Sequence, residues 1–155
     1  MTQTTKQRAD STWVWKSFMR GYNPIYMGPL ALSRQNAMME YIEGNTAAVL
    51  SARAATGHTR AYAEKIDLAA MTPQDALSSS GYCLANAGKE YLVFLPGGGE
   101  VTLDLSLTSG LFVAEWFNPA TGLAIAGQSV SGGAKRVYQS PLLGDAVLYH
   151  TRSKP

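Results

Sequence analysis

The chain has 155 residues, of which 46% are hydrophobic and 15% charged, and its formal net charge is +2 at pH 7. This length allows one domain with its own core, or a small domain with an appended segment. The thirteen Lys and Arg residues are scattered, with Lys135-Arg136 as the one adjacent pair. The sequence therefore excludes a basic stripe of the kind that follows a nucleic-acid backbone.

The single cysteine, Cys83, excludes an internal disulfide framework. It lies in an apolar run, which indicates a small buried side chain. No stretch approaches the roughly 20 apolar residues that span a bilayer, and residues 1–12 lack the apolar centre of a signal peptide. We therefore expect no membrane contact, and the sequence leaves the localisation open.

The first predicted helix covers Trp13–Arg20. Asp10, Ser11 and Thr12 precede it and offer side chains that can cap its first turn, and Gly21 can end it in a left-handed conformation. Apolar groups occur around most of its circumference. Such a helix is expected between partners rather than on a surface.

Three further helices are predicted before the midpoint of the chain. One runs from Leu32 to Glu43, and a short alanine-rich one covers Ala47–Ala55. The last begins after Thr59, a favourable N-cap, and extends to about Met71, where Thr72-Pro73 ends it. Glu64 and Asp67 are three residues apart on its polar side, and this spacing is typical of a solvated helix face.

The second half changes to short runs of β-branched and aromatic residues separated by glycine-rich turns. Val101, Leu103 and Leu105 alternate with polar residues, which indicates a strand with one face in water. Seven strands at this spacing predict a small antiparallel sandwich. The predicted strands are Gly81–Asn86, Glu90–Leu95, Glu100–Leu105, Leu111–Phe117, Leu123–Val130, Lys135–Gln139 and Ala146–Thr151.

Several segments together resemble the C-terminal region of a bacterial glycoside-hydrolase family. In that family an apiosidase-like (β/α)-barrel is followed by a small β-sandwich, which is described as a "putative collagen-binding domain of a collagenase". The segments that carry the resemblance are WVWKSFMRGYNPIYM, YAEKIDLAAMTP, GYCLANAGKEYLVFLPGGGEVTLDL, AEWFNPATG and GDAVLYH.

The resemblance implies an α+β chain in two parts. Residues 1–75 would be a helical segment that corresponds to the end of the barrel, and residues 76–155 a seven-stranded antiparallel β-sandwich. The carboxylates that hydrolyse a glycosidic bond would belong to the missing part of the barrel, so we expect no catalytic residues here. The sequence also lacks metal-ligand spacing around His58 and His150, and it carries no cofactor motif.

Aromatic residues are the remaining candidates for a binding site. Sugar rings stack on exposed Trp and Tyr faces, and Trp116, Tyr82 and Tyr138 of the sandwich are the candidates for such contacts. Aromatic residues at alternating strand positions also serve as core packing, and this alternative is the more usual role for Trp116.

Trp13, Trp15 and Phe18 are the candidate interface residues. In the resembled family the helices and one side of the sandwich face the barrel, and a large apolar area left in water usually finds a partner. We therefore expect a homo-oligomer, most simply a twofold dimer, with these side chains buried between or beneath the subunits.

The leading functional hypothesis is a non-catalytic accessory domain that supports a catalytic barrel or binds polysaccharide or a fibrous protein. One alternative is a truncated or split hydrolase subunit that needs a partner with the barrel. Another is a self-associating structural protein. Fold-level analogy alone does not decide among these functions.

Overall fold

A computed structural model describes residues 10–25 and 47–153 of the chain. Neither α-helix in these ranges is long and apolar enough to cross a membrane. The described residues form two α-helices, two 3₁₀ turns and nine β-strands. In chain order these are α1 (Ser11–Met19), α3 (Ala47–Lys65), η1 (Leu68–Ala70), β1 (Thr72–Pro73), η2 (Asp75–Leu77), β2 (Cys83–Asn86), β3 (Glu90–Leu95), β4 (Gly98–Asp104), β5 (Leu111–Phe117), β6 (Ala124–Ala126), β7 (Val130–Ser131), β8 (Lys135–Leu143) and β9 (Ala146–Arg152).

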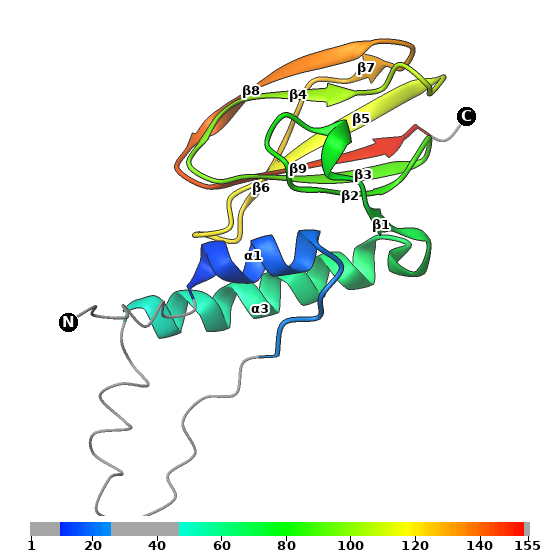
Figure 1. Cartoon of the computed structure of the whole chain (residues 1–155). Helices are drawn as coiled ribbons and strands as arrows, with labels where there is room; N and C mark the ends of the chain where they lie inside the picture. Colours follow the sequence, from blue (N-terminus) through cyan, green and yellow to red (C-terminus); the bar gives the residue numbers. More distant parts are fainter. Residues whose placement is uncertain (1–9, 26–46, 154–155) are drawn as a thin grey trace, which may run out of the picture.

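The strands form two antiparallel sheets. The larger has seven strands in the order β1-β2-β3-β9-β5-β6, with β7 also paired to β5, and the smaller consists of β4 and β8. The two helices lie along one face of the larger sheet, and the smaller sheet covers the other face (Figure 1). This arrangement confirms the predicted α+β class. The strand count differs because Leu123–Val130 divides into β6 and β7, and because Thr72–Pro73 pairs with β2.

Helix α1 forms where the sequence predicts it. Asp10 is its N-cap, and the Asp10 carboxylate accepts a hydrogen bond of 2.8 Å from the Trp13 backbone N–H. Gly21 follows the helix with a φ of 77°, as the predicted stop requires. Val14, Trp15, Phe18 and Met19 are buried.

Helix α3 corrects the predicted boundaries of two segments. Ala47–Ala55 and the segment after Thr59 are one continuous helix that ends at Lys65, and Thr59 lies inside it rather than at an N-cap. The alanine-rich start and the burial of Thr59 outweigh the cost of Gly57 within a helix, which is about 1 kcal/mol. The predicted helix Leu32–Glu43 lies outside the described residues.

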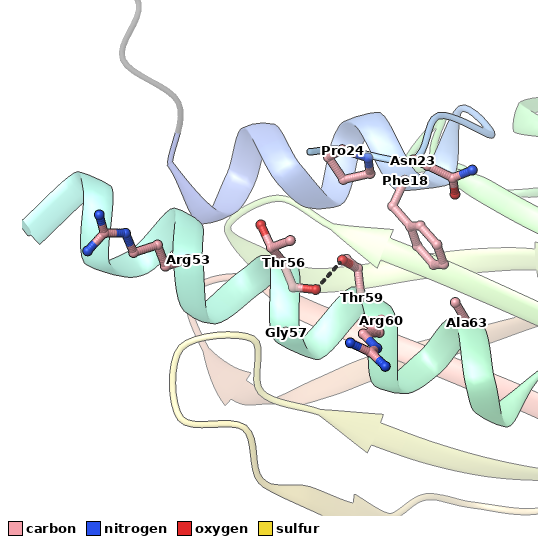
Figure 2. Close-up of a pocket in the computed structure, with 9 residues that line it drawn as sticks. All are labelled: Phe18, Asn23, Pro24, Arg53, Thr56, Gly57, Thr59, Arg60 and Ala63. Atoms are coloured by element: carbon pink, nitrogen blue, oxygen red, sulfur yellow. Dashed lines mark hydrogen bonds between the residues drawn. The ribbon is translucent and has the colours of Figure 1, made fainter. Parts of the chain in front are cut away.

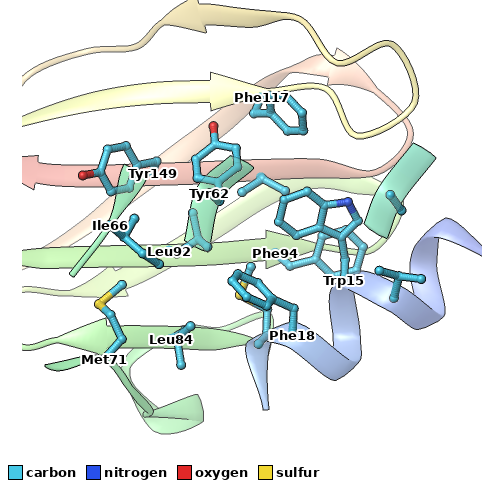
Figure 3. Close-up of a cluster of buried hydrophobic side chains, with 14 of the residues drawn as sticks. Trp15, Phe18, Tyr62, Ile66, Met71, Leu84, Leu92, Phe94, Phe117 and Tyr149 are labelled. Atoms are coloured by element: carbon cyan, nitrogen blue, oxygen red, sulfur yellow. The ribbon is translucent and has the colours of Figure 1, made fainter. Parts of the chain in front are cut away.

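Two hydrophobic cores lie on opposite faces of the larger sheet. The helix-side core contains Trp15, Phe18, Tyr62, Phe94, Phe117 and Tyr149, together with smaller buried side chains (Figure 3). The inter-sheet core, between the larger sheet and the β4–β8 sheet, consists of Cys83, Ala85, Tyr91, Val93, Leu95, Val101, Leu103, Leu105, Phe112, Ala114, Trp116, Tyr138, Ala146 and Leu148. Because successive side chains of a strand point to opposite faces of the sheet, neighbouring residues of the larger sheet belong to different cores.

Candidate functional site

Two of the three predicted sugar-binding aromatics are buried. Trp116 is 4% exposed and Tyr138 6% exposed, and both belong to the inter-sheet core. Each lies at an inward position of its strand, so neither ring offers a face to a ligand. These two positions are packing residues in this structure, and of the three only Tyr82 reaches the surface.

Tyr82 is half-buried, and cations of its own chain occupy the space over its ring. The Lys16 Nζ lies 5.3 Å from the ring centroid and the Arg20 Cζ 4.9 Å from it. Phe94 contacts the same ring edge-on, with centroids 6.1 Å apart. These contacts attach α1 to the sandwich by cation–π interactions, and they leave a small basic surface rather than an open stacking platform.

The three candidate interface residues lie in different environments. Trp15 is fully buried and Phe18 is 3% exposed, both in the helix-side core of their own chain. Trp15 stacks on Phe94 with centroids 6.1 Å apart. Trp13 is 47% exposed and is the member of this set that a partner could reach.

A surface cavity of about 450 Å³ lies between the end of α1 and one side of α3 (Figure 2). Phe18 and Ala63 contribute apolar surface, and Arg53 and Arg60 are the two cationic residues of the lining. Arg60 also pairs with Glu64 at 2.9 Å, in an exposed contact worth little energy. The remaining lining residues are Asn23, Pro24, Thr56, Gly57 and Thr59.

A polar cluster around Glu115 joins α3 to β5. The Tyr62 hydroxyl donates to Glu115 Oε1 at 2.8 Å, and Lys65 Nζ lies 2.5 Å from the same oxygen. Lys65 also lies over the ring of Tyr149, 4.8 Å from its centroid. Burial, and then the hydrogen bond to Glu115, raise the pKa of the Tyr62 hydroxyl. Sequence reasoning missed this cluster because 50 residues separate Lys65 from Glu115.

Two other acidic side chains in the described ranges, those of Asp104 and Asp145, have structural partners. Asp104 accepts hydrogen bonds from both the backbone and the hydroxyl of Ser106, and these bonds lower the pKa of its carboxyl. Asp145 accepts from Thr12 Oγ1 at 2.6 Å and from the Gly97 N–H at 2.8 Å. Within residues 10–25 and 47–153, no three His, Cys, Asp or Glu side chains form a group that could hold a metal ion.

A family model described as "Putative collagen-binding domain of a collagenase" matches residues 70–148, slightly more than half of the chain. No curated protein matches. Among solved structures, a "Glycoside hydrolase" is similar with a TM-score of 0.59 and 14% identity, over 74% of this chain and 27% of that one. A family 5 glycoside hydrolase from Bacteroides vulgatus ATCC 8482 is similar with a TM-score of 0.54 and 16% identity, over 63% of this chain and 23% of that one. The chain thus spans about a quarter of these two proteins, and at this identity the likeness shows the fold alone.

Proposed function

The chain belongs to the family described as "Putative collagen-binding domain of a collagenase", and from this premise we propose that it is a non-catalytic accessory module that supports the barrel of a glycoside hydrolase. The observation that carries the proposal is the structural likeness to about a quarter of two glycoside hydrolases. The remaining three quarters of those chains have no counterpart in this one.

The arrangement of acids supports a non-catalytic role. Hydrolysis by a pair of carboxylates needs both groups to flank the scissile bond. In the described ranges Glu115 is bound by Tyr62 and Lys65, and Asp104 by Ser106. These carboxylates stabilise local structure, and neither lines the cavity between α1 and α3.

We assign the contact with the barrel to the helical segment. Several large apolar side chains are exposed there: Trp13 by 47%, Tyr22 by 66%, Ile25 by 80% and Leu50 by 49%. Burial of such area is favourable by roughly 25 cal/mol per Å². The cavity beside α3, which Phe18 and Ala63 help to line, would accept an apolar side chain from the barrel.

Two alternatives remain as proposals of different classes. As a split subunit, the chain would be required for the activity of a separately encoded barrel. As a self-associating protein, it would bury Trp13 against a second copy, and light scattering at micromolar concentration would then give twice the chain mass. A strictly monomeric mass, unchanged in Trp13→Ala, would exclude self-association.

Binding of polysaccharide or a fibrous protein is a further candidate, and the collagen named in the family description favours the fibrous protein. Tyr82 is the one predicted binding aromatic at the surface, with Lys16 and Arg20 over its ring. Co-sedimentation with insoluble polysaccharide or with collagen fibrils, compared between the parent chain and Tyr82→Ala, would test this function.

Purified chain alone is expected to hydrolyse no glycoside. The measurement is product release from a panel of aryl glycosides and plant oligosaccharides. The non-catalytic role would be overturned by turnover that follows the protein through purification and disappears in Glu115→Gln or Asp104→Asn.

A further inference from the structure

His150 is a fully buried imidazole between the two sheets. It lies on β9, where its neighbours across the larger sheet are Tyr91 on β3 and Ala114 on β5. Its ring contacts Tyr138 of the smaller sheet edge-on, with centroids 5.0 Å apart, and Phe112 at 6.1 Å. Through Tyr138, the histidine takes part directly in the contact between the sheets.

Among the residues that the structure describes, neither ring nitrogen of His150 has a hydrogen-bond partner, and the buried hydroxyl of Tyr138 has none either. The other titratable groups of the inter-sheet core are Cys83 and Tyr91. Burial raises the pKa of the Cys83 thiol to about 12, and the Tyr91 hydroxyl accepts a hydrogen bond from the Gly88 N–H at 2.7 Å.

No buried carboxylate is available to His150. Within residues 10–25 and 47–153, no Asp or Glu side chain is buried. Burial raises the pKa of the Tyr138 hydroxyl, while the nearby cation Arg136 has a smaller, lowering effect. On β4, the buried residues that join the inter-sheet core are apolar. A proton on the imidazole would therefore add a charge and a second N–H donor without supplying an acceptor, which is costly in an apolar interior.

His150 lies between the two sheets and takes no part in the helix-side core. The helix-side core contains no buried histidine in the described ranges, and its side chains come from the helices, the segment between α3 and β1, and the opposite face of the larger sheet. The smaller sheet has two strands, and its β4–β8 pairing does not involve His150. Water could therefore reach the imidazole by separation of the sheets, with the helix-side core still packed.

We propose that His150 is an acid-sensitive element: its protonation loosens the packing of the β4–β8 sheet on the larger sheet, while the helices keep theirs. The direction of this pH response follows from the pKa of the buried imidazole, which burial lowers from 6.5 to about 4. The state in which the sheets are separated binds the proton more tightly than the state in which they are packed. The packed state is therefore favoured above pH 6.5, and its stability falls as the pH is lowered from 6.5 to 4. At pH 5 the opening equilibrium should rise about 30-fold.

The proposed acid response is tested by hydrogen exchange of the full chain, measured by mass spectrometry from pH 7.5 to pH 4.5. The measured rates are corrected for the intrinsic exchange rate at each pH. Because a two-stranded sheet that is detached from its support is only marginally stable, protection of the β4 and β8 amides should fall about 30-fold by pH 5, with little change in α1 and α3. In His150→Leu, or in His150→Gln if the leucine variant does not fold, protection of β4 and β8 should become insensitive to pH in this window.

His58→Gln is the matched control, because the chain has two histidines and His58 lies on α3. This variant should keep the acid response of the parent. An equal loss of protection in the helices and in the smaller sheet would mean global acid unfolding and would overturn the proposal. The same acid response in both His150 variants, or no response in the parent chain, would overturn it as well.

Discussion

Replacement of Trp15 by alanine is expected to lower the free energy of unfolding by about 3–5 kcal/mol. The Trp15 side chain is fully buried and contacts rings from both helices and from the larger sheet. Its partners are Phe18, Tyr62, Phe94 and Phe117, with ring centroids 5.8–6.2 Å away. Its removal would leave a cavity where α1, α3 and the sheet meet (Figure 3). Urea unfolding, followed by circular dichroism, measures the effect.

Trp13→Ala provides the matched control two residues away on the same helix. Trp13 is 47% exposed, so this change should cost less than about 1 kcal/mol. Similar losses in the two variants would show that Trp15 is not the anchor of the helical layer. A small effect of Trp15→Ala on unfolding, combined with dissociation of a dimer, would instead support the alternative in which this residue lies at an interface between subunits.

Gly98→Ala is expected to destabilise the chain by about 2–5 kcal/mol. Gly98 has a φ of 71°, and a Cβ at this position would overlap the carbonyl oxygen of Gly144. The left-handed conformation accounts for about 1–2 kcal/mol of the loss. The overlap adds about 1–3 kcal/mol, because a backbone oxygen within a paired turn cannot move away freely.

Gly99→Ala separates the two contributions. Gly99 has a similar φ of 82°, but a Cβ there would have no atom within 4 Å. Its substitution should therefore cost only the conformational part, about 1–2 kcal/mol. Equal losses at the two positions would mean that the close approach of Gly98 to Gly144 does not contribute to stability.

Local patterns in the sequence predicted most of the strands. Alternation placed Val101, Leu103 and Leu105 on one buried face, and all three are fully buried. The strands Glu90–Leu95 and Leu111–Phe117 have the predicted boundaries. These predictions succeed because a strand with one dry face repeats every two residues and ends at turn residues with special backbone requirements.

The boundaries of the helices and the candidate site depend on tertiary contacts that local patterns do not encode. Thr59 has the chemistry of an N-cap, yet packing buries it inside α3. Trp116 and Tyr138 have side chains that are typical of a binding surface, yet both are buried between the sheets. The smaller sheet covers Trp116, and Tyr138 belongs to the smaller sheet itself. No sequence pattern indicated a role for His150, because the side chains that surround its imidazole, and thus its hydrogen-bond acceptors, are set by the tertiary fold.

The accessory role is tested most directly by thermal unfolding of the glycoside-hydrolase barrel encoded nearest to this chain, with and without the chain. We expect the barrel to hydrolyse its substrate alone and a saturating amount of the chain to raise the melting temperature of the barrel, as binding to a folded state requires. Gly57→Trp, which fills the cavity beside α3, should weaken this effect, whereas Ala61→Trp, at an exposed position of the same helix that does not line the cavity, should preserve it. An unchanged melting temperature of the barrel at a saturating amount of the chain would exclude the accessory role.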